Sequence, residues 1–316
     1  MTVARSAICF ATDAGYLVPT LVAAGQARRW SNPLLAEVLV LAVGLEDEVA
    51  EMAGPAFADA GVRLLRVDAN AAGGDAMMAR LLLDRLVPPG FDDFLYLDAD
   101  IQVVASVDPL LARPVPAGQV RAALDPMALR VRRGGRDGAG LVARMRTAGI
   151  APEGCAQYFN SGVLHISRVG WDATGQAAMA LHRAAPAGQP FPDQDALNIV
   201  LGTRVLPLSL AWNFPIFLRN AGLDRAIRPA ILHFMAQPKP WHGTFPPWSA
   251  AEAAPYRDVL SCFPDLAPLL PAMAPARRAK YAVQQRVKRV LEAATWGRGA
   301  LHDAVLAAEA EIAQLA

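Results

Sequence analysis

The stretch that decides the fold is Phe94-Leu95-Tyr96-Leu97-Asp98-Ala99-Asp100-Ile101-Gln102-Val103-Val104. An apolar run leads into two aspartates spaced i, i+2, and a second apolar run follows them. Short runs of this composition are typical of a buried strand in a parallel sheet. A buried carboxylate is unfavourable by several kcal/mol unless it is paired or binds a metal. Two such groups at one strand end therefore need a common partner.

Asp98 and Asp100 can share that partner because alternate side chains of an extended chain point to the same side. We interpret them as ligands of a divalent cation at the carboxyl end of a central strand, where open α/β sheets bind their ligands. The alternative interpretation is a strand that simply ends in an acidic turn.

Strand-like and helix-like segments alternate on both sides of this stretch. Strands are expected at 7–11, 38–43, 62–67 and 120–124, and helices at 17–29, 46–60 and 75–86. Asp75 is a suitable N-cap for the last helix, which Pro88-Pro89-Gly90 ends. The alternation predicts an α/β protein with a doubly wound, parallel sheet.

Composition excludes several classes of protein. Apolar residues make up 54% of the 316 residues, but no window has the ~18 uninterrupted apolar residues that a membrane span needs. Residues 1–10 are too brief an apolar run for a secretory signal. The net charge of +1 gives no reason to expect nucleic acid as a partner. Three widely separated cysteines, Cys9, Cys155 and Cys262, indicate reduced thiols and a cytoplasmic protein.

Basic residues gather in two segments, 130–146 and 277–289. The first has six arginines, and residues 130–154 as a whole are rich in Arg and Gly and lack strong periodicity, so we expect a long loop with one helix there. Such a loop could cover an acidic glycan, or it could be a solvated surface. Its Gly138-Ala139-Gly140-Leu141-Val142-Ala143 formally matches a dinucleotide fingerprint, but no apolar strand precedes it, and we reject that interpretation.

Three further stretches combine polar and apolar residues in a distinctive way. They are Tyr158-Phe159-Asn160-Ser161-Gly162-Val163, Asp193-Gln194-Asp195-Ala196-Leu197-Asn198, and His233 followed by Lys239-Pro240-Trp241-His242.

With Phe10-Ala11-Thr12-Asp13 and the Tyr96–Asp100 stretch, these segments form five ordered motifs over residues 7–242. In this order and spacing they resemble glycosyltransferase family 8, which includes glycogenin and bacterial lipopolysaccharide glycosyltransferases. The resemblance implies a GT-A fold: a Rossmann-like, mixed but mainly parallel central sheet flanked by helices. It also implies a UDP-sugar donor, a Mn²⁺ cofactor and transfer of a hexose, glucose or galactose, with retention.

Carried over by motif position, the metal ligands would be Asp98, Asp100 and His233. One imidazole beside two carboxylates suits Mn²⁺ better than Mg²⁺, which remains the alternative. Lys239 is one of only three lysines beside twenty-seven arginines, and it is fixed between two prolines. We expect it to be a point charge for the diphosphate. The alternative interpretation of His233 is a histidine of the core, and that of Lys239 is a solvent-facing lysine.

The remaining carry-over concerns the nucleoside and the sugar. Thr12, Asp13 and Tyr16 would hold uracil and ribose, and Arg80 would contact the donor unless it is a plain helix-surface residue.

Sugar hydroxyls would be read by Asp125, Asn160, Asp193 and Gln194. Gln194 would lie near the anomeric carbon, but an amide is a poor nucleophile. We therefore favour same-face attack by the acceptor hydroxyl, with Asp193 as a covalent nucleophile the minority alternative.

Nothing in the sequence identifies the acceptor beyond a glycan or glycolipid, with an anionic one suited to the arginines. The composition changes near Trp248, so we expect a catalytic domain at 1–248 and a C-terminal helical extension at 249–316. Residues 277–291 form a basic amphipathic helix. It would suit peripheral contact with the inner face of a membrane, docking on the catalytic domain, or a homodimer.

Two other functions stay open. A haloacid-dehalogenase-like phosphatase also uses Asp-x-Asp at a strand end, although its motif lies near the N-terminus and has Thr or Val where Gln102 stands. A non-catalytic sugar-nucleotide binding protein would retain the same motifs without turnover.

Overall fold

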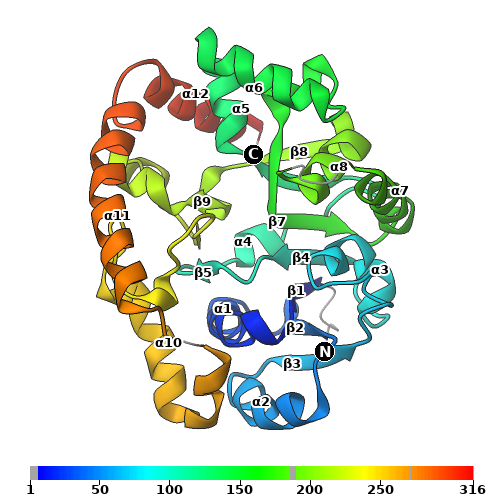
Figure 1. Cartoon of the computed structure of the whole chain (residues 1–316). Coiled ribbons are helices and arrows are strands. Elements are labelled where there is room, and N and C mark those ends of the chain that lie inside the picture. Colours follow the sequence, from blue (N-terminus) through cyan, green and yellow to red (C-terminus); the bar gives the residue numbers. More distant parts are fainter. Residues whose placement is uncertain (1–5, 186–189, 271, 316) are drawn as a thin grey trace.

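A seven-stranded sheet forms the centre of the protein (Figure 1). The computed structural model describes residues 6–185, 190–270 and 272–315. The strand order is β3-β2-β1-β4-β7-β6-β8. The strands are β1 (Ser6–Thr12), β2 (Ala36–Val43), β3 (Arg63–Val67), β4 (Asp93–Leu97), β6 (Val120–Leu124), β7 (Phe159–Ser167) and β8 (Val205–Leu208). Only β7 runs antiparallel to its neighbours. The prediction of a mixed, mainly parallel sheet is confirmed.

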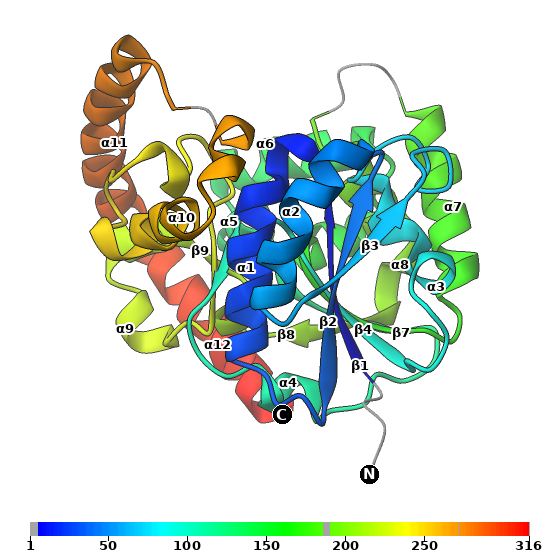
Figure 2. The same cartoon turned by 90° about the horizontal axis from the view of Figure 1, so that it is seen from below.

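Helices cover both faces of this sheet (Figure 2). α1 (Leu17–Arg29) and α2 (Asp47–Asp59) lie on one face. α3 (Leu83–Leu86), α7 (Trp171–Ala184) and α8 (Pro192–Leu201) lie on the other. The central strands β1 and β2 are mostly apolar because alternate residues enter two separate cores. In β1, for example, Ile8 and Phe10 pack on the α1 side, whereas Ala7 and Cys9 pack on the α7 side.

The stretch 94–104 is not a single strand, which corrects the expectation from its composition. β4 ends at Leu97, and Asp98, Ala99 and Asp100 form a turn. β5 (Ile101–Val103) then joins β10 (Ile231–His233) and β9 (Phe214–Pro215) in a separate three-stranded sheet. The two aspartates therefore lie where the chain passes from one sheet to the other.

The segment 130–154 was predicted as a long loop with one helix, but most of it is helical. It contains α5 (Pro126–Arg133) and α6 (Gly135–Thr147), followed by a short 3₁₀ helix (Pro152–Gln157). Asp125 caps α5, arginine is a good helix former, and Gly134, with a φ of 76°, separates the two helices. The glycines allow close packing, since a Cβ on Gly138 would lie 2.8 Å from the carbonyl oxygen of Arg130.

Helices also form the C-terminal part, as expected. They are α10 (Ala250–Cys262), α11 (Pro275–Trp296) and α12 (Ala300–Leu315), and the short helices α4 (Asp108–Leu111) and α9 (Asp224–Ile227) precede them. Trp296 packs against Phe217 with ring centroids 5.5 Å apart, and Leu301 and Val305 are buried in the α1-side core. No helix in the described ranges combines the length and apolar character needed to cross a bilayer. The domain boundary near residue 248 stays a prediction.

Candidate active site

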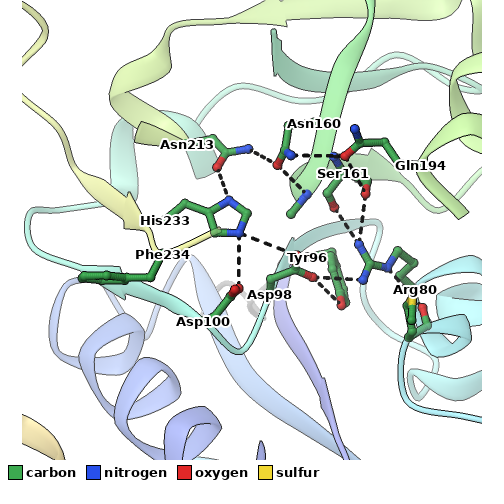
Figure 3. A network of polar contacts seen from close by, with 12 residues as sticks. Arg80, Tyr96, Asp98, Asp100, Asn160, Ser161, Gln194, Asn213, His233 and Phe234 are labelled. Atoms are coloured by element: carbon green, nitrogen blue, oxygen red, sulfur yellow. Dashed lines mark hydrogen bonds and ion pairs between the residues drawn. The ribbon is translucent and has the colours of Figure 1, made fainter. Parts of the chain in front are cut away.

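Asp98, Asp100 and His233 meet at the junction of the two sheets (Figure 3). One ligand atom from each lies within 4.8 Å of the others. His233 Nε2 lies 3.2 Å from an oxygen of Asp100 and 3.9 Å from one of Asp98. The register of β10 against β5 pairs His233 with Ile101, the residue after Asp100, which fixes this approach. The three predicted metal ligands are therefore adjacent.

A hydrogen bond from behind sets the orientation of the His233 ring. Nδ1 of His233 lies 2.8 Å from Oδ1 of the buried Asn213. Asn213 Nδ2 donates to Asn160 Oδ1 at 2.9 Å, and Asn160 Oδ1 also accepts from the backbone N–H of Gly162 at 3.0 Å. Because a backbone N–H can only donate, the Asn160 atom that it contacts must be the oxygen. This assignment fixes which atom of each amide side chain donates and which accepts. Nδ1 then carries a proton, and Nε2 is the ring nitrogen that faces the two aspartates and can bind a cation once it is deprotonated.

A glycine makes room for this cluster. A Cβ on Gly162 would lie 2.3 Å from Cε1 of His233 and 2.8 Å from Oδ2 of Asp98. The carbonyl oxygen of Gly162 accepts from the backbone N–H of Asp98 at 2.8 Å. Strand β7 thus lies directly against the cluster, and only a residue without a side chain fits there.

Asp98 is held by two further side chains. The Arg80 guanidinium lies 3.1 Å from Asp98 Oδ1, and Tyr96 Oη donates to the same oxygen at 3.0 Å. Arg80 is 6% exposed, donates to Ser161, and lies 3.8 Å from Asp193. Arg80 therefore is not a helix-surface residue. It lies between Asp98, a predicted metal ligand, and Asp193, a predicted sugar-binding residue.

Lys239 contacts the other carboxylate. Its Nζ lies 2.5 Å from Asp100 Oδ2 and donates to the carbonyl oxygen of Phe234 at 2.6 Å. Burial raises the pKa of Asp100, but the positive charges of a protonated His233 and of Lys239 outweigh burial and lower this pKa below its ordinary value. Burial raises the pKa of Asp98, and Arg80 only partly offsets the rise. Lys239 is thus buried in the site, and the solvent-facing alternative is excluded.

A network of amides lies beside the cluster. Gln194 Oε1 accepts from Asn160 at 3.1 Å and from the backbone N–H of Ser161 at 3.0 Å, and Gln194 Nε2 donates to Asp125 at 3.2 Å. Asn160 also donates to Asp125 at 3.2 Å, while Asp125 caps α5 through Met127. Burial raises the pKa of Asp125 despite these donors. The network fixes the orientation of both amides.

Two cavities meet at the aspartates. The first, about 320 Å³, is lined by predicted nucleoside-binding residues, namely Thr12, Asp13, Tyr16 and Arg80, together with Asp98 and Asp100. The second, about 400 Å³, is lined by Asp98, Asp100, His233, Asp125, Asn160 and Gln194. A ligand that fills both cavities would pass directly over the cluster.

The donor set fits a divalent cation. Two carboxylates and one neutral imidazole nitrogen are ligands that Mn²⁺ accepts, and the second nitrogen of the imidazole has a hydrogen-bond acceptor behind it, as in protein metal sites generally. The close approach of the cluster to Gly162 and the orientation of His233 both support this interpretation.

Every predicted site residue lies in this region, but four contributors were missed: Tyr96, Ser161, Gly162 and Asn213. The first three belong to the quoted motifs, where only their neighbours were singled out. Asn213 stands between Trp212 and Phe214, and a lone amide in an apolar segment is the signal that could have identified it.

A family model, glycosyl transferase family 8, matches residues 8–244. The chain belongs to glycosyltransferase family 8. This membership confirms the resemblance, and it favours the glycosyltransferase interpretation over the phosphatase one.

Family 8 relatives in Escherichia coli (strain K12) include the lipopolysaccharide glucosyltransferase WaaO. It is 30% identical over 161 residues, which cover 47% of this chain and 43% of the relative. A lipopolysaccharide 1,2-glucosyltransferase is 27% identical over 181 residues, which cover 53% and 49%. The match thus spans less than half the length of either relative.

Solved structures share the fold of this family 8 chain. The galactosyltransferase LgtC, in complex with donor and acceptor sugar analogs, aligns with a TM-score of 0.63 at 21% identity, covering 87% of this chain and 99% of that one. The bifunctional glycosyltransferase WbbM aligns with a TM-score of 0.62 at 20% identity, covering 83% and 50%. These alignments agree with the predicted GT-A fold.

Proposed function

We propose that the chain is a Mn²⁺-dependent, retaining glycosyltransferase that moves a hexose, glucose or galactose, from a UDP-sugar to a glycan or glycolipid. One observation carries the proposal: the cluster of Asp98, Asp100 and His233 lies where two cavities meet. The smaller cavity would hold the nucleoside, and the larger would hold the sugar and the acceptor. The names of the curated relatives support a sugar as the transferred group.

The charged side chains suit the departure of UDP. A bound Mn²⁺ would supply positive charge to the diphosphate. Lys239 and Arg80 are buried cations, and they contact Asp100 and Asp98, respectively. Both therefore lie within reach of a phosphate group held at the cluster. Fixed positive groups in a site shielded from water stabilise the charge that develops on a leaving group.

The environment of Gln194 favours same-face attack. Its oxygen accepts hydrogen bonds from Asn160 and Ser161, so it is not free to bond to the anomeric carbon. Asp193 lies 3.8 Å from the Arg80 guanidinium, which would reduce the nucleophilicity of its carboxylate. The acceptor hydroxyl is then the nucleophile, and the departing phosphate takes its proton. Asp125, Asn160 and Gln194 would position the sugar.

The test combines binding and turnover. UDP-glucose or UDP-galactose with Mn²⁺ should raise the melting temperature, and GDP- and dTDP-sugars should raise it less. UDP release should need Mn²⁺ and fall at least 100-fold in Asp100→Asn. An anomeric proton spectrum of the product should show retention. Affinity for UDP-sugar without release of UDP would identify a binding protein, and full activity of Asp100→Asn in EDTA would refute the proposal.

We further propose that the outer face of α11 contacts an anionic bilayer surface. Val283, Val287 and Val290 are 63%, 55% and 68% exposed, and 277–289 holds five basic residues besides the cavity-lining Lys288 and no acid. An exposed apolar stripe among cations complements anionic lipid. The protein should sediment with vesicles that contain phosphatidylglycerol but not with pure phosphatidylcholine. Val287→Asp should weaken this binding, while Val169→Asp, at a valine 65% exposed elsewhere, should not.

A further inference from the structure

The larger cavity has a wall that no motif predicted. Besides the residues of the metal cluster and the amide network, α11 lines it through Gln285, Lys288 and Glu292. Spacings of three and four residues place these side chains on one stripe of the helix. The exposed Val283, Val287 and Val290 occupy other positions, so α11 has a face toward the cavity and a face toward solvent.

Two of the three side chains on this stripe retain free hydrogen-bonding capacity. Glu292 Oε2 accepts from Asn220 Nδ2 at 2.7 Å, which leaves the other carboxylate oxygen available. Within the part of the chain that the structure describes, no hydrogen bond or ion pair within 4.0 Å involves the Lys288 ammonium. Gln285, 5% exposed, is directed instead to the carbonyl oxygen of Gln237. A donor and an acceptor four residues apart are therefore presented together.

The chemistry of the cavity points to a sugar. Apolar side chains including Met127, Phe217 and Trp248 line it, which suits the C–H surface of a pyranose ring. A hydroxyl group needs both a donor and an acceptor, and Lys288 with Glu292 supplies both. The two opposite charges also offset each other, and none of the six arginines at 130–146 is among the described lining residues. Among the described α11 residues that line the cavity, one cation and one anion balance, so they offer no surplus of positive charge for a phosphate.

We infer that the inner face of α11 is the acceptor subsite, and that Lys288 and Glu292 bind the hydroxyls of an uncharged sugar at the acceptor terminus. This inference rests on the proposed function, since the same cavity would hold the transferred hexose beside Gln194. It assigns recognition of the acceptor to the C-terminal helix and recognition of the donor to the residues around Asp98.

Steady-state kinetics with lactose and methyl β-glucoside as neutral acceptors test the assignment. Lys288→Met and Glu292→Gln should each raise the acceptor KM at least about tenfold, because each removes a hydrogen bond to a charged group. The KM for the UDP-sugar should change less than twofold. Arg298→Met is the matched control, because Arg298 is an exposed arginine just beyond α11, and it should change neither constant.

Saturation-transfer NMR measures the binding of lactose and of lactose 6′-phosphate directly, so this test does not require that the protein transfer a sugar. Binding of lactose that weakens in Lys288→Met and Glu292→Gln supports the subsite even if no UDP-sugar is consumed, whereas absence of UDP release alone refutes only the proposed function. An unchanged acceptor KM in both variants would overturn the inference. So would preferred binding of the phosphorylated sugar that is lost in Lys288→Met, or no binding of either sugar to the wild-type protein.

Discussion

Nδ1 of His233 lies 2.8 Å from Oδ1 of Asn213, and this contact sets which ring nitrogen can bind a cation. Asn213 is 2% exposed and is itself held by Asn160. The His233 ring is therefore oriented before any ligand arrives. Sites built in this way lose little entropy on binding, since the ligand side chains are already ordered.

Asn213→Ala should lower the affinity for Mn²⁺ about 10- to 100-fold, the usual effect of removing such a hydrogen bond. Electron paramagnetic resonance of free Mn²⁺ during a titration measures the change. Asn70→Ala, at an exposed turn, is the control and should bind normally. Equal affinity in the two variants would show that Asn213 does not orient the ligand.

Gly162→Ala should abolish Mn²⁺ binding, because the added methyl group would lie 2.3 Å from Cε1 of His233. Gly54→Ala in α2 is the matched control, since no atom lies within 4 Å of its added Cβ. The control should be more stable by about 0.5–1 kcal/mol, because alanine is the better helix former. Calorimetric titration and chemical unfolding of both variants check the pair. A Gly162→Ala protein that binds Mn²⁺ would contradict the claim that only glycine fits beside the cluster.

Arg144→Met should destabilise the protein by about 3 kcal/mol, because it removes the two-bond ion pair that Arg144 makes with the buried Asp195 carboxylate. Arg144 donates to both oxygens of Asp195, at 3.0 and 2.8 Å, and Tyr158 Oη donates at 2.6 Å. Arg146→Met, at an exposed arginine of the same helix, should change stability by less than about 0.5 kcal/mol. Urea unfolding distinguishes the two, and similar midpoints would refute the pairing.

Folding stability should fall in acid through His165. This side chain is fully buried in β7, and neither ring nitrogen has a hydrogen-bond partner among the described residues. Burial, with a smaller effect from the Arg121 charge, lowers the pKa of His165 to about 3. The unfolded histidine titrates near ~6.5, so it binds a proton between these two values while the folded one does not. Stability is then lost progressively as the pH falls below about 6.5, by roughly 2 kcal/mol at pH 5.

The variant His165→Leu removes this titration. Its free energy of unfolding, measured by urea at pH 5 and pH 7.5, should differ less between the two conditions than that of the wild type. Parallel dependence on pH in both proteins would mean that other groups cause the loss.

The sequence predicted the central sheet well because its middle strands, such as β1 and β2, contribute alternate residues to two cores and are therefore mostly apolar. The stretch from Phe94 to Val104 misled in one respect, since both apolar runs are strand-like but belong to different sheets. Composition alone does not reveal which partner a strand pairs with. The helical extent of the arginine-rich segment was underestimated because its apolar residues are few and glycines are frequent in α6.

Sequence motifs identified the residues of the site, but the contacts that these residues make with one another could not be predicted from the sequence. The proximity of Lys239 to Asp100 depends on how the loop after β10 returns to the cluster, which spacing cannot show. Asn213 lies twenty residues before His233, and only the pairing of β9 with β10 brings the two segments together. The α11 wall has the same origin, because helix docking decides which stripe faces inward.

The position of the aspartate turn has a consequence for local unfolding. Asp98 follows a strand of the large sheet, whereas Asp100 precedes β5, and His233 ends β10 in the small sheet. A cation bound by all three would cross-link the two sheets, which share an apolar core but form separate hydrogen-bond ladders. Amide exchange in β5 and β10 should then slow on addition of Mn²⁺, while exchange in β2 and β3 stays the same. The cofactor would then raise the free energy needed to open the small sheet, because it binds only where both sheets are folded.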